Sequence, residues 1–297
     1  MPDLEAPRRE EELYLARQDE VNPLRPPMTG DVYCDVAIPG VSDEEDPSGE
    51  GLAMILAHPC SMREGPVLRQ RIPVARVVPW NKEISFGAWR SNHISIMPLP
   101  HLIQSSKSEM YAVVFERIGR VDSAELEISR RTASLTEYGI AVMQQRRIFF
   151  DTRAVVEIDA LMEACAGVIL ETELAEEWND ALIDVAQKEE GWLDAALASE
   201  AQAFYEMLHL DRTVPGPEAK KVKKYKLSDD IQSAARRPQV KRAVLSLLKE
   251  EQAKRSTQVG VPSPVADTDA SASVEVPDQR KGVTPDAASD ERDVDRL

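Results

Sequence analysis

A series of short apolar segments decides the fold, and the first of them is Leu52-Ala-Met-Ile-Leu-Ala57. A continuous apolar run of this length, ending before His58, is typical of a buried strand. The second segment, Ile72-Pro-Val-Ala-Arg-Val-Val78, is rich in β-branched residues, and so is the third, Tyr111-Ala-Val-Val-Phe115. Short strands with turn signals between them predict a small β-barrel.

Further elements extend this pattern on both sides. Asp31-Val-Tyr-Cys-Asp-Val-Ala-Ile38 alternates between apolar and polar residues and predicts an earlier strand. Asn92 to Met97 predicts another strand, and Ile118 to Val121 a short continuation of the third segment. Charged residues from Glu10 to Glu20 predict a helix ahead of the barrel, which the proline-rich stretch from Asn22 to Pro27 breaks.

After Ser134 the pattern becomes helical. Ser134 and Glu137 have the spacing of a capping box, at the start of a helix from Leu135 to Phe149. Two later helices are predicted in the basic part of the chain, one capped by Ser228 and one beginning at Pro238 and ending near Arg255. Between the helix that ends at Phe149 and this basic part, apolar residues at helical spacing predict helices at Ala154–Leu170, Glu173–Lys188 and Gly191–Leu210. Trp178 and Trp192 are expected to pack in the core.

Charge divides the chain into unlike parts. The formal net charge is −16 for the whole chain, −19 for residues 1–211, +8 for residues 212–255 and −5 for residues 256–297. The last part has no aromatic residue and is rich in Ser, Pro, Ala and Asp, which predicts disorder. We therefore expect an N-terminal extension (1–27), a barrel with its closing helix (28–150), an acidic helical region (151–211), a basic helical segment (212–255) and a disordered acidic tail (256–297).

Composition excludes several classes of protein. The negative charge argues against a protein that coats a nucleic-acid duplex, and 5% aromatic residues against a stacking platform for single strands. No apolar run approaches the ~20 residues that span a bilayer, and the acidic N-terminus is unlike a signal peptide. Three cysteines (Cys34, Cys60 and Cys165) form no even disulfide framework and suit a cytoplasmic location. Phosphate-binding glycine motifs and hydrolase motifs are absent, so we expect no cofactor.

The densest group of reactive side chains follows the first strand, in His58-Pro-Cys60-Ser-Met-Arg63. A thiol beside an imidazole is a candidate nucleophile. His58, Cys60 and Cys34 have the chemistry of zinc ligands, but no fourth ligand is evident, so we expect no metal. The alternative is structural, because cysteines are ordinary core residues and His-Pro ends a strand well. The candidate catalytic residues are His58, Cys60, Arg63 and Arg76.

Two groups of basic residues are candidates for binding. Arg69 and Arg71 share a face if the chain is extended, and they suit a phosphate or a carboxylate; alternatively they pair with the acidic loop Asp43–Asp46. The second group binds either a nucleic-acid backbone, through counterion release, or an acidic surface, which includes that of the chain itself. It comprises Lys220, Lys221, Lys223, Lys224 and Lys226.

The order of segments in the first half resembles the PemK/MazF family of small barrel toxins, over residues 28–149. The resemblance implies an SH3-like barrel and, as family properties, endoribonuclease activity, homodimers and inhibition by an antitoxin protein. The segments that carry it are Met28-Thr-Gly-Asp-Val-Tyr33, Gly51-Leu-Ala-Met-Ile-Leu-Ala57, Ile72-Pro-Val-Ala-Arg-Val-Val78, Glu116-Arg-Ile-Gly-Arg-Val-Asp-Ser-Ala-Glu-Leu126 and Leu135-Thr-Glu-Tyr-Gly-Ile-Ala-Val-Met143.

The chain departs from the family where the family's catalysis is located. The family uses an arginine just before the second strand, where this chain has Gly51, and a threonine at the end of the third, where it has Val78 or Pro79. We therefore expect a non-enzymatic binding or regulatory protein with a protein partner, or with a nucleic acid bound by the basic segment, and no membrane contact. The alternatives are a diverged endoribonuclease, with His58 and nearby arginines, and a thiol-dependent activity at Cys60.

Overall fold

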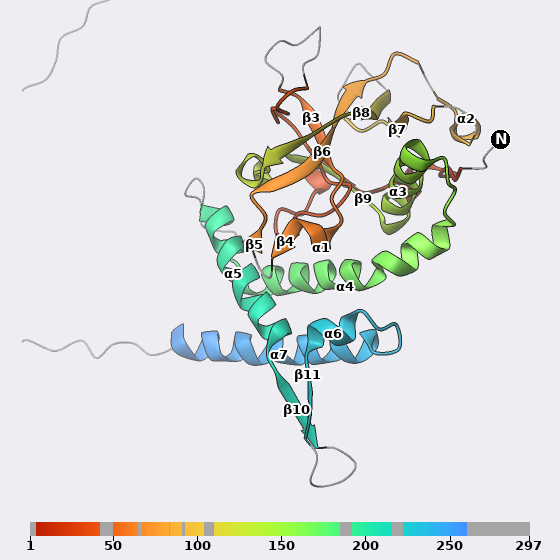
Figure 1. Cartoon of the computed structure of the whole chain (residues 1–297). Coiled ribbons are helices and arrows are strands. Elements are labelled where there is room, and N and C mark those ends of the chain that lie inside the picture. The colour runs from red at the N-terminus through yellow and green to blue at the C-terminus, as the bar shows by residue number, and fades with distance from the viewer. Residues whose placement is uncertain are drawn as a thin grey trace, which may run out of the picture.

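The computed structural model describes residues 4–41, 50–64, 67–82, 84–90, 93–103, 110–184, 192–215 and 222–259. The chain has an α+β fold, in which an N-terminal antiparallel half-barrel of seven strands is followed by helices (Figure 1). In the picture the long helix α4 runs along one side of the half-barrel, and α7 lies beyond α4. No helix of the described residues is both long and apolar enough to cross a membrane.

The half-barrel is a single sheet with the strand order β1-β9-β2-β3-β6-β8-β7. Every pairing of neighbouring strands is antiparallel. A separate two-stranded sheet and a one-turn helix form an excursion between β3 and β6. The strands of the main sheet are β1 (Tyr14–Arg17), β2 (Val32–Tyr33), β3 (Leu52–Ile55), β6 (Arg71–Pro79), β7 (Ile96–Pro100), β8 (Met110–Asp122) and β9 (Arg131–Leu135); the excursion holds α1 (Pro59–Met62), β4 (Arg63–Glu64) and β5 (Val67–Leu68), and α2 (Phe86–Trp89) follows β6.

The sheet is buried on both faces, which explains the continuous apolar runs of its central strands. Successive side chains of a strand point to opposite faces. In β3, Ala53 and Ile55 belong to one apolar cluster, whereas Met54 between them belongs to the other. In β6, Val74 and Ala75 divide in the same way. The strands predicted at residues 52–57, 72–78 and 111–121 are confirmed, while the one predicted at 31–38 is reduced to β2 and the one at 92–97 is shifted to β7.

Side chains join the two edge strands of the sheet, β1 and β7. The Tyr14 hydroxyl donates to the carbonyl oxygen of Pro100 at 2.9 Å, and Arg17 Nη1 donates to that of His101 at 2.8 Å. Glu10 lies between the two segments, 2.7 Å from His101 Nδ1 and in an ion pair with Arg17. The helix predicted at residues 10–20 is therefore wrong: this segment forms β1 between two short 3-10 turns, because Leu13 and Tyr14 are buried in the barrel core and β1 pairs with β9.

A buried ion pair fastens the segment before β2 to the sheet. Arg131 Nη1 lies 3.1 Å from Asp31 Oδ2, and the two side chains are 0% and 2% exposed. Arg131 Nη2 also donates to the carbonyl oxygens of Asn22, at 2.7 Å, and Arg25, at 2.8 Å. Burial lowers the pKa of Arg131, but Asp31, Tyr33 and Glu176 together more than offset this, so the pKa is raised overall. These bonds hold the proline-rich stretch of the N-terminal segment in place.

The helix that closes the half-barrel, α3 (Glu137–Thr152), begins two residues later than predicted. Its N-cap is Thr136, whose Oγ1 accepts from the Gly139 amide at 2.9 Å. Ser134, the predicted cap, is buried in β9, a strand that the capping-box pattern concealed. Arg146 of α3 is buried and donates to three carbonyl oxygens around α2 and β7, and burial lowers its pKa to about 10.

One continuous helix, α4 (Ile158–Leu182), replaces the two helices predicted at residues 154–170 and 173–188. Its first half packs on the half-barrel through Ile158, Cys165 and Ile169. Its second half packs against α5 (Trp192–His209), α6 (Leu227–Ile231) and α7 (Arg237–Val259) in a separate apolar core that contains Trp178 and Phe204. No glycine or proline separates the two predicted helices, so nothing in the chain ends the first one.

The basic segment contains a hairpin that the sequence pattern did not predict. Strands β10 (Arg212–Pro215) and β11 (Val222–Tyr225) pair with Arg212 opposite Tyr225, and the hairpin projects away from the half-barrel (Figure 1). The N-cap of α6 is Lys226 rather than Ser228, and α7 continues four residues beyond the predicted end near Arg255. The first four residues of the expected tail, 256–259, are therefore helical, and its remainder lies outside the described residues.

Candidate functional site

The residues of the predicted thiol–imidazole motif begin the excursion from the half-barrel. The carbonyl oxygen of His58 accepts from the amides of Ser61, at 2.8 Å, and Met62, at 3.1 Å, which starts α1. The imidazole of His58 is half-buried, and burial lowers its pKa. Cys60 lies in α1, but its side chain is outside those the structure describes. The backbone of His58 therefore has a structural role, because its carbonyl oxygen caps the first turn of α1. The thiol hypothesis stays a prediction.

Arg63 connects the excursion to the helices. Its guanidinium lies over the ring of Tyr205 in α5, 5.3 Å from the ring centre. Glu171 of α4 interacts with the Tyr205 hydroxyl, and burial raises the pKa of the Glu171 carboxyl; Tyr205, Arg63 and His209 act in the opposite direction. Burial also raises the pKa of Tyr205. This group of side chains links the half-barrel, α4 and α5 in a mostly buried position.

Arg76, the remaining catalytic candidate, lies inside the half-barrel. It is 1% exposed, and its Nη1 donates to the carbonyl oxygen of Val36 at 3.1 Å. The same Nη1 lies 2.7 Å from the position that a Cβ on Gly51 would occupy. The missing side chain of Gly51 thus leaves room for the guanidinium. Arg63 and Arg76 have different partners, one on the helices and one within the sheet.

Arg69 and Arg71 lie at the surface, at the junction of two strands. Both are exposed, with Arg69 just after β5 and Arg71 the first residue of β6. A bend at Gln70 separates them. Neither side chain makes a hydrogen bond or ion pair with a described residue. The acidic loop that was their predicted partner, residues 43–46, lies outside the described residues.

Two contrasting sets of cations stand out in the described part of the basic segment. In the first set, helix α7 is held against the acidic helices by ion pairs at 3.3, 3.7 and 2.9 Å. These pairs join Arg237 to Glu163, Lys241 to Glu177, and Arg255 to Glu200. Helix α7 thus neutralises acidic residues of α4 and α5, but none of these pairs involves the lysine run at residues 220–226, whose docking on the chain's own acidic surface stays a prediction.

The second set makes no such contact. Among the described residues, no hydrogen-bond or ion-pair partner exists for Lys224, Lys226, Arg242 or Lys249. Arg242 and Lys249 are exposed and seven residues apart, so they lie on one side of α7, two helical turns from each other. Lys224 is exposed on the hairpin, and Lys226 is half-buried at the start of α6. Lys220 and Lys221 lie outside the described residues, as does the side chain of Lys223.

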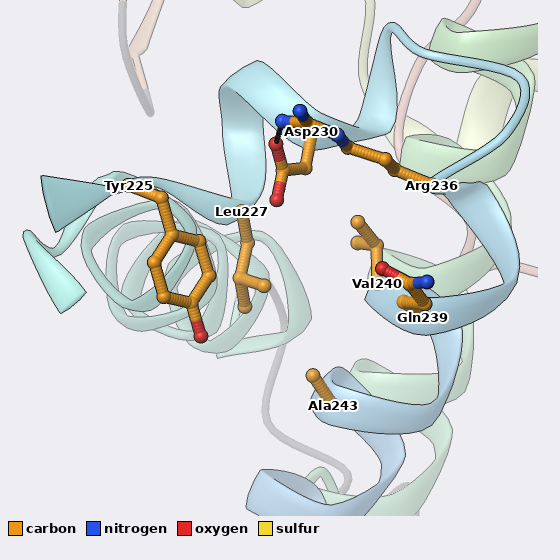
Figure 2. A pocket seen from close by; sticks show the side chains of 7 residues that line it. All are labelled: Tyr225, Leu227, Asp230, Arg236, Gln239, Val240 and Ala243. Carbon is orange, nitrogen blue, oxygen red and sulfur yellow. Dashed lines mark hydrogen bonds and ion pairs between the residues drawn. The ribbon is translucent and has the colours of Figure 1, made fainter. Parts of the chain in front are cut away.

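A small pocket opens between the hairpin, α6 and α7 (Figure 2). Its volume is about 280 Å³. Figure 2 shows Tyr225 and Leu227 facing Val240 and Ala243 of α7 across it. Polar groups stand at its margin, namely Gln239 and an ion pair between Asp230 and Arg236 at 2.5 Å. Sites for small molecules are usually larger, at roughly 300–1,000 Å³, so this pocket suits one or two side chains of a peptide.

The pocket and the unpaired cations are neighbours in the chain. Lys224 and Lys226 flank Tyr225, and Arg242 precedes Ala243. The candidate site combines this apolar pocket with the four unpaired cations, of which Arg242 and Lys249 lie about a third of a turn around α7 from the residues that line the pocket. We call the two together the cationic surface: Tyr225, Leu227, Val240 and Ala243 with Lys224, Lys226, Arg242 and Lys249. Sequence reasoning found the two lysines and missed the rest, because the folding of α6 and α7 decides which cations stay unpaired. The seven-residue spacing of Arg242 and Lys249, which places both on one side of a helix, is a signal in the sequence that could have identified them.

Metal chemistry receives no support from the described part of the chain, where no group of three or more metal-ligating side chains occurs. Cys34 is a free thiol whose pKa is raised by burial and by Asp35. Cys165 is buried between α3 and α4, with its Sγ 3.5 Å from Gln144 Oε1. No protein-family model, curated protein or solved structure matches this chain.

Proposed function

We propose that this protein is a non-enzymatic binding protein that engages an anionic partner, a nucleic acid or an acidic protein surface, through the cationic surface. The observation that carries the proposal is the division of cations in α7. Arg237, Lys241 and Arg255 neutralise acidic residues of α4 and α5, while Arg242 and Lys249 stay exposed without a partner among the described residues. Cations that serve only to stabilise the fold are expected to pair with carboxylates of the chain, and Arg242 and Lys249 do not pair with any that the structure describes.

The charge of the remaining chain makes this surface distinctive. Residues 1–211 carry −19, of which −14 belongs to residues 151–211, so a polyanion is repelled by the acidic helices α4 and α5 and attracted near the hairpin and α7. Four cations that contact a single-stranded nucleic acid give a salt slope of about −2.8, which corresponds to roughly 50-fold weaker binding between 50 and 200 mM salt. Binding should therefore be local and strongly dependent on salt.

Fluorescence anisotropy tests this proposal with two probes, a labelled 20-nucleotide RNA of mixed sequence and a labelled polyglutamate peptide. We expect one of them to bind at low salt, and the variant Arg242→Gln/Lys249→Gln to bind at least tenfold more weakly. The control variant Lys82→Gln/Lys254→Gln removes the same charge from exposed positions and should bind like wild type. The proposal is wrong if neither probe binds, or if both variants bind equally well.

We also propose that the half-barrel has the SH3-like plan of the PemK/MazF family and provides a surface for a protein partner. The supporting features are the antiparallel order of β2, β3, β6 and β8 and the helix α3 directly after the last strand. Family members form homodimers, so we expect self-association through this part of the chain. Sedimentation equilibrium measures it, and a monomer at all concentrations would contradict it.

One observation favours a second candidate, a diverged endoribonuclease. The family's catalytic arginine precedes the second strand, and here the Arg76 guanidinium fills the space beside Gly51 at that position. Against it, Arg76 is 1% exposed. Incubation of RNA with the full chain, with His58→Ala and with Arg76→Lys separates the two functions. Cleavage without added metal that both variants lose would establish the ribonuclease; no cleavage across salt and pH supports the binding protein.

A further inference from the structure

We infer that the acidic C-terminal tail of this chain, residues 260–297, docks on the cationic surface and competes there with the external partner. The inference rests on the proposed function for its consequence, but the docking itself does not require a partner. The segment placed in the pocket is Val274-Glu-Val-Pro277. Three observations carry it: the charge of the two parts, the size of the pocket, and the distance that the tail must cover.

Charge is complementary between the two parts. Residues 260–297 contain nine acidic and four basic residues, and they continue directly from the end of α7 at Val259. The cationic surface offers four cations with no partner among the described residues, against two exposed carboxylates nearby, Asp229 and Glu250. An acidic peptide is therefore attracted to this side of α7 and repelled by the acidic helices α4 and α5.

The pocket fits what the tail carries. Its volume of about 280 Å³ and its lining by Tyr225, Leu227, Val240 and Ala243 suit small aliphatic side chains (Figure 2). In an extended segment, Val274 and Val276 lie on the same side, and Glu275 lies on the other. The two valines can thus face the pocket while the carboxylate of Glu275 faces away from it.

Distance selects this segment over the other apolar part of the tail. Val240 lies nineteen residues before Val259 in α7, a separation of about 28 Å along a helix. The nearer apolar stretch, residues 261–265, is at most six residues from Val259 and spans only about 20 Å when fully extended. Val274 is fifteen residues away, for which a flexible chain has a mean span of roughly 20 Å and an extended one about 50 Å.

The mean span of the tail up to Val274 is close to the distance from Val259 to the pocket, and this favours docking within one chain. A tethered segment reaches its highest effective concentration, in the millimolar range, when its natural span is close to the distance required. Docking of modest intrinsic strength is then largely complete within one chain. Asp267 and Asp269, eight and ten residues beyond Val259, pass beside Lys249, which is about 15 Å from that end of the helix. The tail therefore covers the cations that we assign to the partner.

Chemical footprinting of lysines tests the docking without any partner. The full chain is acetylated briefly with an amine-specific reagent, and the modification of each lysine is measured by mass spectrometry. The tail variant replaces four carboxylates by amides: Asp267→Asn, Asp269→Asn, Glu275→Gln and Asp278→Asn. The matched control does the same at exposed carboxylates elsewhere: Glu11→Gln, Asp19→Asn, Glu20→Gln and Glu116→Gln.

We expect Lys224 and Lys249 to react at least threefold faster in the tail variant than in wild type. Lys82, exposed in the half-barrel, should react equally in all proteins and is the internal control. The variant Val274→Ser/Val276→Ser, which keeps every charge, should also increase the reactivity of Lys224 and Lys249, because loss of the pocket contact weakens the docking of the whole tail. Wild-type protection should not change with protein concentration; protection that rises with concentration would show that the tail of a second chain is the occupant.

Equal reactivity of Lys224 and Lys249 in wild type and tail variant overturns the docking, and so does an equal increase in the control variant. The anisotropy probes separate this result from the proposed function. If the tail variant binds RNA or polyglutamate about tenfold more tightly than wild type, both inferences stand. Footprint protection with no binding of either probe by any variant supports the docking and refutes the proposed function; the reverse pattern refutes only the docking.

Discussion

Removal of the Arg131 side chain tests whether the buried ion pair holds the N-terminal segment on the half-barrel. In Arg131→Met, Asp31 keeps the bond from the Met28 amide at 2.9 Å but loses its cation in a position that is 2% exposed. Breaking one partner of a buried pair costs about 3–5 kcal/mol, because it leaves an uncompensated charge. The carbonyl oxygens of Asn22 and Arg25 also lose their donor, at about 1 kcal/mol each.

We therefore expect Arg131→Met to lower the free energy of unfolding by about 5–7 kcal/mol, which approaches the total stability of many domains. Urea denaturation followed by tryptophan fluorescence measures this loss. The control is Arg120→Met, at an exposed arginine of β8 with no partner among the described residues, which should change stability by less than about 0.5 kcal/mol.

A double variant makes the prediction specific to the pair. Asp31→Asn removes the uncompensated charge while keeping an oxygen to accept from the Met28 amide, so Arg131→Met/Asp31→Asn should be more stable than Arg131→Met alone by about 1–3 kcal/mol. If Arg131→Met costs less than about 1 kcal/mol, or if the double variant is the less stable protein, the buried pair does not hold this segment as described.

Three further predictions concern other buried contacts. Arg146→Lys keeps the charge but loses bonds to the carbonyl oxygens of Trp89, His93 and Ile96, so thermal unfolding should show a loss of about 2–3 kcal/mol; an unchanged midpoint would contradict it. Gly139→Ala raises helix propensity by about 1 kcal/mol, yet a Cβ at this position would lie 2.4 Å from the carbonyl oxygen of Leu13. Urea titration should therefore show destabilisation of about 1–3 kcal/mol rather than a gain. The raised pKa of Glu171 means that its carboxyl favours the neutral form in the folded state. Its contribution to the free energy of unfolding is therefore complete below the ordinary pKa of about 4.3 and is lost as pH rises through the raised pKa. Glu171→Gln should remove this loss, and equal slopes of stability against pH in the two proteins would refute the assignment.

Much of the half-barrel could be predicted from local pattern. β3, β6 and β8 are continuous apolar and β-branched runs because both faces of the sheet are buried, and a run of this kind has few other structures available. The predictions failed where local preference and tertiary contact disagree. Residues 10–20 are rich in charge and suit a helix, but β9 offers Tyr14 a strand partner and the core buries Leu13.

In the candidate site, too, local pattern identified some residues and tertiary contact decided the others. Lys224 and Lys226 stand out in the sequence as members of a basic run, so they could be singled out directly. Arg242 and Arg237 look alike in sequence, five residues apart in one helix, and only the packing of α7 on α4 gives Arg237 a carboxylate and leaves Arg242 without one. The prominent arginines of the half-barrel, Arg63 and Arg76, proved to be engaged in contacts between elements.

The sequence by itself determined the class of fold, the places of the central strands and main helices, and the contrast between an acidic body and a basic segment. These properties depend on periodicity and composition, which are local and can be read along the chain. The tertiary structure alone decided that residues 14–17 form a strand, that Arg131 and Asp31 form a buried pair, and that some cations of α7 are neutralised while others are exposed. Each of these depends on which distant residue lies opposite, and the free energy of such contacts is fixed only when the chain has folded.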